Sequence, residues 1–520
     1  MQKADAIVVG AGHNGLVAAT FLARAGLDVL VLEEKDVVGG ACRTERPFRK
    51  APGLATSTGA YLLGLMPPEL VTKLGISLPL LRRDPHYFLP TLGNRYLLLG
   101  SDREAARRQF VTFFSEADFR ADDAMRAELA QLREDLAPTW MSEPLSIEET
   151  AERYVRPALR RAFIDLCRKP VGEYLERFGF QSDLVKAMYA VTDGFTGTFG
   201  TYDTPGTGMN FLVHNMCRLP GSDGTWMIVK GGMGTVTRLI AEEVVKANGV
   251  IRTGCKVEEI VVEQGVTRGV RLADGRFIRA STVVVNADPF RMRKLVSKGA
   301  FPAEYEARID GYVRPGSSFK VNLALRDLPR FACLPTDQGQ FGPTIHILPQ
   351  EGDIIRGLID AFEEVKAGRL PNCPPIEWYI HTTIDPTLKD AEGHHNSALF
   401  VQWVPYELAG KRWEDEVDAY VKHLLAICDR FAPGTSDLVV DTFPLHPKAI
   451  ESHFGISYGH IHHVDNSFGF ADRLPYATPV AGLYSCSAGT HPAGSVIGCA
   501  GHNAAVRVLR DLGKAQQPSS

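Results

Sequence analysis

Paired cysteines are what this 520-residue sequence most clearly lacks. Its nine cysteines are scattered and odd in number, and none of them forms a CxxC pattern. A disulfide framework and a cysteine-based zinc site are therefore excluded, and buried thiols in a reducing compartment are favoured. We expect a cytoplasmic protein.

Long apolar runs and an excess of one charge are also missing. No apolar stretch reaches the roughly 20 residues that cross a bilayer, and 57 basic against 61 acidic residues give a net charge of −4. No basic patch with interleaved aromatic residues is present, so we expect no nucleic-acid partner. Strand-like sequence begins within five residues, and we expect no signal or transit peptide ahead of it.

A glycine-rich motif stands near the start of the chain. Residues 10–15 read Gly-Ala-Gly-His-Asn-Gly, which is GxGxxG between an apolar strand at 5–9 and a predicted helix. Gly10 permits the tight turn, Gly12 lets the backbone approach a pyrophosphate, and Gly15 allows close helix–strand packing. The motif predicts a bound dinucleotide.

The residues around this motif support the same prediction. His13 and Asn14 fall at the helix N-terminus, where free N–H groups and the helix dipole favour phosphate. Glu33 follows a second strand at 28–32, at the position where a carboxylate holds ribose hydroxyls, and Glu34 comes directly after it.

A paired glycine follows the second strand. Gly39 and Gly40 resemble the doublet of two-dinucleotide-binding flavoproteins, where it makes a second backbone approach to the cofactor. Ordinary NAD dehydrogenases lack this doublet, so FAD is the expected cofactor. We assign Ala41 and Thr58 to the same cofactor surface.

Cys42 invites comparison with disulfide reductases, in which a second cysteine follows five residues later. Pro47 occupies that position here. Dithiol chemistry is therefore excluded, and Cys42 is interpreted as a small packed residue.

The C-terminal segment 482–498 is glycine-rich and leads into an alanine-rich helix. A helix N-terminus near the pyrimidine edge of the flavin would stabilise the negative charge that develops on reduction. We assign Gly489 and Val496 to the cofactor site on this basis. The plainer interpretation, a strand, turn and helix that close the sheet, holds as structure in either case.

These nucleotide-binding segments are separated in sequence, and single cores stop growing near ~250–300 residues. We therefore predict an α/β, two-domain flavoprotein. Its discontinuous Rossmann-like FAD domain would cover 1–100, 220–300 and 475–515. An α+β substrate or cap domain would cover 101–219 and 301–474, with helices over 102–190.

Together these segments resemble the phytoene dehydrogenase-like branch of the FAD-dependent amine oxidase and desaturase superfamily, over nearly the full chain. The similarity is marked for the pyridine nucleotide-disulfide oxidoreductase domain-containing protein 2 group, although the disulfide of that name is absent here. Further similar stretches lie at 60–63, 204–208, 231–234, 287–289 and 491–505.

The resemblance implies a substrate domain over the flavin, an apolar tunnel, and a backbone contact from Val257 to the adenine. Carotenoid-desaturase members remove a hydride and a proton across a C–C bond, with FAD taking the hydride. A hydrophobic small-molecule substrate follows from the resemblance, while oxygen, a quinone and a nicotinamide stay open as electron acceptors.

Few residues are candidates for catalysis. Hydride transfer depends mainly on positioning, and proton removal needs a nearby base or water. His491 lies in the turn expected beside the isoalloxazine, and an ordinary pKa of about 6.5 suits acid–base work; alternatively it only hydrogen-bonds backbone or flavin. Tyr61 would line the substrate face or pack in the core.

Two other groups of residues have plainer interpretations. His460, His462 and His463 cluster in sequence, but alternation along a strand would separate them, and we expect no metal. The basic stretch 148–169 suits an exposed helix face balanced by Glu148, Glu149 and Glu152; the alternative is peripheral contact with an anionic membrane.

Three functions remain in order of preference. The first is an FAD-dependent dehydrogenase or desaturase that transfers a hydride from a hydrophobic organic substrate to flavin N5. The second is a flavin amine oxidase that produces hydrogen peroxide, and the third is a non-catalytic FAD-bound interaction protein.

Overall fold

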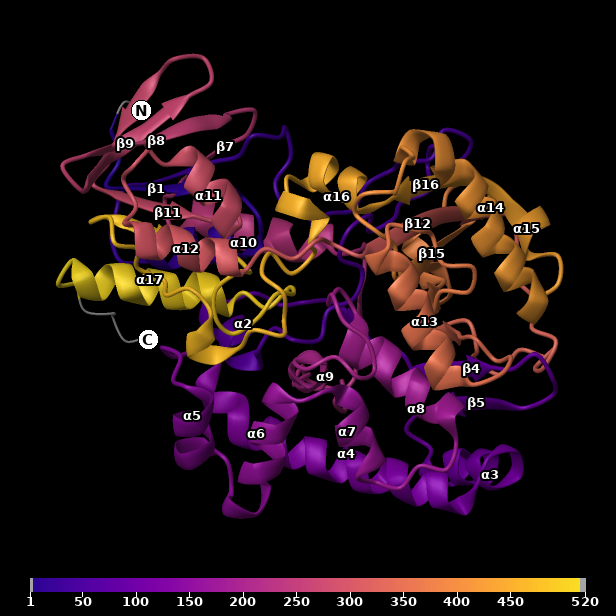
Figure 1. The fold of residues 1–520 in the computed structure, drawn as a ribbon. Helices are drawn as coiled ribbons and strands as arrows, with labels where there is room; N and C mark the ends of the chain where they lie inside the picture. The colour runs from indigo at the N-terminus through magenta and orange to yellow at the C-terminus, as the bar shows by residue number, and fades with distance from the viewer. Residues whose placement is uncertain (1–2, 515–520) are drawn as a thin grey trace.

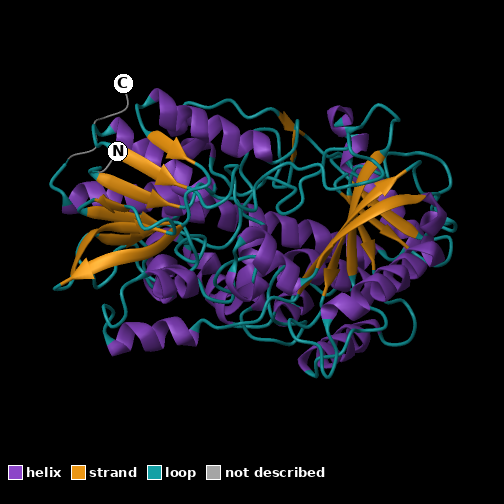
Figure 2. Ribbon diagram, turned by 90° about the horizontal axis from the view of Figure 1, so that it is seen from above, coloured by secondary structure: helices purple, strands orange, loops and turns teal. Residues whose placement is uncertain are grey.

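The computed structural model describes residues 3–514, so residues 1, 2 and 515 of the predicted FAD domain lie outside the described residues. Two β-sheets occupy opposite ends of the molecule, with helices between them (Figure 2). A further layer of helices lies below both sheets in the view of Figure 1.

The first sheet is five-stranded and parallel, in the order β17-β11-β1-β2-β7. The strands are β1 (Ala6–Val9), β2 (Val29–Leu32), β7 (Val250–Arg252), β11 (Thr282–Val285) and β17 (Leu483–Ser485). Strands β1, β2 and β11 are buried throughout, as expected for apolar runs covered on both faces. The predicted Rossmann-like sheet is confirmed.

Helices cover one face of this sheet and a small antiparallel sheet covers the other (Figure 1). On α1 (His13–Arg24) pack α10 (Gly234–Lys246) and α17 (Cys499–Asp511). The opposite layer contains β8 (Val257–Glu263), β9 (Val266–Leu272) and β10 (Phe277–Arg279), whose apolar side chains share a core with β1 and β11.

The second sheet has seven strands in the order β16-β12-β15-β14-β13-β4-β5. Its neighbours pair antiparallel except β4 with β13. The long helix α14 (Trp413–Phe431) packs on it in one apolar core. The strands are β4 (Tyr87–Pro90), β5 (Tyr96–Leu99), β12 (Ser318–Leu325), β13 (Thr344–Ile347), β14 (Ile376–Tyr379), β15 (His395–Gln402) and β16 (Val439–Leu445).

The domain exchange differs from the predicted boundaries at two places. Strands β4 and β5 belong to the seven-stranded sheet, although residues up to 100 were assigned to the FAD domain. Helix α12 (Ala303–Gly311) shares the core of the five-stranded sheet through Tyr305 and Ile309, although 301–474 was assigned to the substrate domain. Both differences arise from contacts between segments far apart in sequence.

The predicted helical region is confirmed. It contains α3 (Arg103–Phe113), α4 (Glu116–Leu136), α5 (Ile147–Tyr154), α6 (Arg160–Arg168), α7 (Val171–Glu176) and α8 (Asp183–Tyr189), followed by α9 (Thr207–His214). Side chains at the N-caps start several of these helices: Asp102 accepts from the Ala105 N–H at 2.9 Å, and Ser146 forms a capping box with Glu149.

Shorter elements complete the connections. These are α2 (Pro68–Leu74), β3 (Leu80–Leu81), β6 (Ile228–Val229), α11 (Pro289–Leu295), α13 (Ile354–Lys366), α15 (Thr435–Leu438) and α16 (Pro447–Phe454).

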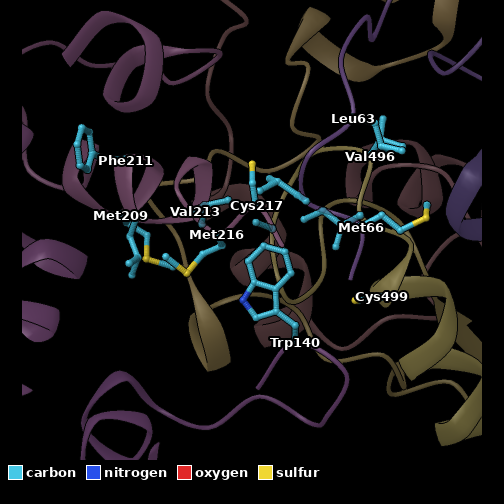
Figure 3. Packing of buried hydrophobic residues seen from close by; sticks show 14 of the residues in the cluster. Leu63, Met66, Trp140, Met209, Phe211, Val213, Met216, Cys217, Val496 and Cys499 are labelled. Carbon is cyan, nitrogen blue, oxygen red and sulfur yellow. The ribbon is translucent and has the colours of Figure 1, made fainter. Parts of the chain in front are cut away.

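One apolar core joins the helical layer to the FAD domain. Figure 3 shows Trp140 beside Met216 and Cys217, with Met66 and Val496 on the side of the five-stranded sheet. These residues come from the layer of helices, from the segment after the glycine doublet and from the C-terminal turn. The two predicted domains therefore pack as one body.

The basic stretch 148–169 forms α5 and α6, and its charges are largely paired. Arg168 contacts Glu148 at 2.7 Å and Arg160 contacts Glu152 at 3.8 Å. These pairs support the interpretation as a solvated helix face. Within residues 3–514, no helix has both the length and the apolar character that crossing a bilayer requires.

Candidate functional site

A single large cavity connects the two sheets. It starts at the carboxyl ends of β1 and β2, and it reaches β12, β14 and β15 of the seven-stranded sheet. The empty space, which includes open solvent at its mouth, is about 2020 Å³. This position matches the rule that ligands of open α/β sheets bind beyond the carboxyl ends of the strands.

The GxGxxG motif forms one end of this cavity. Gly10 has a φ of +98°, a conformation that favours glycine. A Cβ on Gly15 would lie 2.2 Å from the Gly10 carbonyl oxygen, so α1 packs on β1 at a distance that only glycine permits. Gly12 is the N-cap of α1 without a capping side chain, which leaves backbone N–H groups for a phosphate.

Two buried polar atoms at the start of α1 lack protein partners. Within the described chain, His13 Nε2 and Asn14 Oδ1 have no hydrogen-bond partner, and both residues line the cavity. Burial lowers the pKa of His13 to about 4, so its imidazole is neutral. Unpaired polar atoms beside a glycine cradle fit a dinucleotide that would bind there.

The predicted ribose and adenine contacts come together beside β2. Glu33 lines the cavity, and its carboxylate accepts from the backbone N–H groups of Ala11 at 2.8 Å and Lys35 at 3.0 Å. These bonds orient the carboxylate and leave lone pairs for further donors. Glu34 and Val257 line the same cavity, where Glu34 pairs with Arg291 at 2.6 Å.

The glycine doublet continues the cavity wall. The Gly39 N–H donates to the Ala11 carbonyl at 2.9 Å, which joins the doublet to the GxGxxG turn. Gly39, Gly40, Ala41 and Thr58 all line the cavity, and the Thr58 hydroxyl donates to Glu45.

Cys42 also touches this wall but is held as a thiol. Its Sγ lies 3.4 Å from the Met233 carbonyl, and burial raises its pKa to about 12. A thiol with such a pKa is a poor nucleophile at neutral pH, in agreement with its interpretation as a packed residue.

The C-terminal turn reaches the cavity at residues other than those predicted. Ala488, Ser495 and Val496 line it, whereas His491 and Gly489 do not. His491 is buried with Nε2 at 2.9 Å from the Thr139 carbonyl, and burial lowers its pKa to about 4. The prediction of His491 as a catalytic residue is corrected, because its ring is used to anchor the helical layer.

The histidine cluster is not a strand, contrary to prediction. His460 contacts Asp465 at 3.2 Å, while His462 lies 2.8 Å from the Thr196 carbonyl through Nε2. His462 and His463 line the cavity. The described residues contain no group of three or more His, Cys, Asp or Glu side chains arranged to hold a metal ion.

Tyr61 lines the far part of the cavity, within an aromatic and polar group that sequence reasoning missed. Its ring lies 4.7 Å from that of Tyr379, between centroids. The Lys320 ammonium stands 4.2 Å from the centre of the Tyr61 ring and donates to the Gly59 carbonyl at 2.8 Å. Glu377 and Arg83 complete this end of the cavity.

Burial shifts the ionisation of this group toward neutral forms. The pKa of Glu377 is raised to about 8, and the pKa of Lys320 is lowered well below its ordinary value. A charged residue inside an otherwise apolar strand, as in Ser-Phe-Lys-Val-Asn-Leu-Ala-Leu at 318–325, was the available sequence signal.

Comparison with known families agrees with this geometry. The family described as flavin containing amine oxidoreductase matches residues 15–348. This range includes the glycine doublet and most of the cavity wall, but it ends before the C-terminal turn.

Relatives match over different shares of the chain. The mouse (Mus musculus) pyridine nucleotide-disulfide oxidoreductase domain-containing protein 2 is 33% identical, covering 98% of this chain and 94% of the relative. A limonene dehydrogenase component from Castellaniella defragrans is 24% identical, covering 99% and 96%. A zeta-carotene-forming phytoene desaturase of Myxococcus xanthus is 27% identical, covering 56% and 55%.

Among solved structures, a double mutant of putrescine oxidase has a similar fold. The TM-score is 0.61 at 17% sequence identity, and the match covers 98% of this chain and 99% of that one. At this identity the likeness concerns the fold alone.

Proposed function

The chain belongs to the flavin-containing amine oxidoreductase family, and from this premise we propose that it is an FAD-dependent dehydrogenase acting on a hydrophobic organic substrate. The observation that carries the proposal is the continuous cavity. It joins a dinucleotide cradle on one sheet to an enclosed, mainly apolar space on the other.

FAD is the cofactor. The family is flavin-containing, and the cradle at Gly10, Gly12 and Gly15 is built for a dinucleotide, so the flavin is held as its adenine dinucleotide. When bound, FAD supplies a two-electron acceptor that takes a hydride at N5. We assign its phosphates to the start of α1 and its ribose to Glu33.

The chain's own residues would position the substrate and exclude water. Leu62, Phe400 and Ile461 line the cavity beside Tyr61 and Tyr379, and such walls hold an apolar skeleton in a fixed orientation. Glu377 is our assignment for the group that accepts a proton, because it is buried in this cavity and its pKa is raised to about 8. The names limonene dehydrogenase and phytoene desaturase of two relatives support an apolar substrate.

An amine oxidase is the second candidate, because the cavity contains an aromatic pair. Tyr61 and Tyr379 approach to 4.7 Å between ring centroids, whereas sequence reasoning had found no aromatic residue at such a position. The electron acceptor (oxygen, a quinone or a nicotinamide) belongs to either proposal.

An anaerobic flavin-reduction screen tests the proposal. Purified FAD-loaded protein is mixed with isoprenoids, other lipophilic compounds and amines, and bleaching of the flavin absorbance is followed. We expect bleaching by lipophilic compounds that carry no amine. Bleaching by amines alone, with release of hydrogen peroxide in air, would move the assignment to an amine oxidase. Absence of bleaching by every compound would favour a non-catalytic FAD-bound protein.

A further inference from the structure

The inner end of the cavity contains a guanidinium group with few protein partners. Arg83 lies in the loop between β3 and β4 and is 2% exposed. Its Nε donates to the Trp226 carbonyl at 3.0 Å and its Nη1 to the Thr344 hydroxyl at 2.9 Å. In the part of the chain that the structure describes, no carboxylate lies within ion-pair distance of Arg83.

Other buried arginines are satisfied differently. Arg473, which is 1% exposed, donates to five acceptors within its own region. Arg126 pairs with the Asp122 carboxylate at 2.9 Å. Arginine has five N–H donors, so Arg83 keeps three that are directed to no protein group while it lines the cavity. A buried charge in this state is costly unless a ligand supplies the counter-ion.

The groups beside Arg83 suit an anionic ligand. Tyr61, Tyr379 and Thr344 line the same cavity and carry hydroxyl groups. Glu377 is 1% exposed, and its Oε1 has no hydrogen-bond partner in the described chain. Because burial raises the pKa of Glu377 to about 8, its carboxyl group is protonated at neutral pH and does not repel an anion.

We propose that Arg83 binds a carboxylate group of the substrate, so that the substrate is an amphipathic carboxylic acid rather than a hydrocarbon or an amine. The planar guanidinium fork matches a carboxylate in two parallel hydrogen bonds. The apolar walls at Leu62, Phe400 and Ile461 would hold the hydrocarbon part. The inference rests on the proposed function for the reaction, but the binding of the carboxylate can be measured without turnover.

Isothermal titration of the FAD-loaded full-length protein at pH 7 tests this with three ligands of one chain length. Octanoate, octanol and octylamine differ only in the head group. A hydrogen-bonded charge should bring octanoate about 10- to 100-fold tighter binding than octanol. Equal affinities for octanoate and octanol, or tighter binding of octylamine, would overturn the proposal.

Matched variants locate the contact. Arg83→Gln should remove most of the preference for octanoate and leave octanol binding unchanged. Arg82→Gln is the control, since Arg82 is the adjacent, exposed arginine and contacts Asp84 at 3.8 Å; it should behave as the wild type. If Arg83→Gln does not fold, the comparison of the three ligands on the wild-type protein still decides. A preference for octanoate that persists in folded Arg83→Gln would contradict the assignment.

The outcomes separate this inference from the proposed function. If octanoate binds through Arg83 but no compound bleaches the flavin, the inference stands and the dehydrogenase proposal fails. If neutral lipophilic compounds bleach the flavin while octanoate shows no preference over octanol, the dehydrogenase proposal stands and the inference fails.

Discussion

Glu377 on β14 and Lys320 on β12 face the same cavity, and burial shifts their pKa values in opposite directions. Desolvation disfavours the charged form of each group, so the carboxyl gains affinity for its proton and the ammonium loses it. At neutral pH this end of the cavity therefore approaches a state in which Arg83 is the dominant charge. A site of this kind discriminates ligands by their own charge.

The raised pKa of Glu377 predicts a loss of stability with rising pH. The pKa is about 8 in the folded protein against an ordinary 4.5, so the folded state binds this proton more tightly than the unfolded state does. The contribution is complete below about pH 4.5 and is lost as the pH rises to about 8. At about 1.4 kcal/mol for each pKa unit, the upper bound is about 5 kcal/mol. Glu377→Gln should therefore become more stable relative to the wild type between pH 5 and 9.

Thermal unfolding of FAD-free protein across this pH range measures the difference. Arg83, Tyr379, Asp193 and His346 surround Glu377, and the pKa of Asp193 is itself raised by burial to about 7. Asp193→Asn is thus the matched control for a second titration in the same range. Identical pH profiles for the wild type and Glu377→Gln would refute the buried proton.

Residues of the cofactor cradle could be predicted, because they are contiguous in sequence and each has one backbone task. The polar end could not, since Arg83, Lys320 and Glu377 come from three separate segments and none has a motif. The error at His491 has the same origin. Its ring direction depends on Thr139, a residue of the helical layer that no local pattern connects with it.

At the scale of elements, the first βαβ unit depends on close packing of α1 against β1. A Cβ on Gly15 would lie 2.2 Å from the Gly10 carbonyl oxygen and 3.0 Å from the Asn286 amide nitrogen. Alanine in a helix interior otherwise gains about 1 kcal/mol over glycine. Overpacking costs about 1–3 kcal/mol, so Gly15→Ala should be destabilising on balance.

We expect Gly15→Ala to lower the Tm and to weaken FAD binding at least ~10-fold, because the helix that presents its N–H groups to the phosphates is displaced. Fluorescence titration of the apoprotein with FAD measures the affinity. Gly311→Ala is the control, since no atom lies within 4 Å of its Cβ and it ends α12. Unchanged FAD affinity in Gly15→Ala would contradict the assigned cradle.

Elements formed from neighbouring residues were predictable and distant pairings were not. The unit β1-α1-β2 and the helices over 102–190 follow from local patterns of apolar residues, glycines and caps. The parallel pairing of β4 with β13 joins Tyr87 to Thr344, and nothing in either segment encodes that partner. This pairing brings Arg83 beside Thr344 and thus builds the inner end of the cavity.

At the scale of the whole molecule, the two sheets are connected by the shared cavity and by the apolar core around Trp140 (Figure 3). That core includes residues of α1 and α17 from the FAD domain and of α4 to α9 from the helical layer. Units that share so much buried surface cannot separate without exposing it to water. Sequence reasoning instead suggested a cofactor domain interrupted by a distinct substrate domain.

The shared core predicts a single unfolding transition that includes release of the cofactor. FAD binds only the folded protein, and at 100 times its Kd it should add about 2.7 kcal/mol of stability. Flavin fluorescence reports release from the cradle, while tryptophan fluorescence reports Trp378 in the seven-stranded sheet and Trp140 in the helical layer. On heating, the two signals should change together within about 2 °C, and both midpoints should rise with added FAD. Trp378→Phe checks that the probe in the seven-stranded sheet reports the same event. If flavin were released well below the tryptophan transition, with only the lower midpoint moved by FAD, the five-stranded sheet would be an independent unit and the shared core would contribute little to cooperativity.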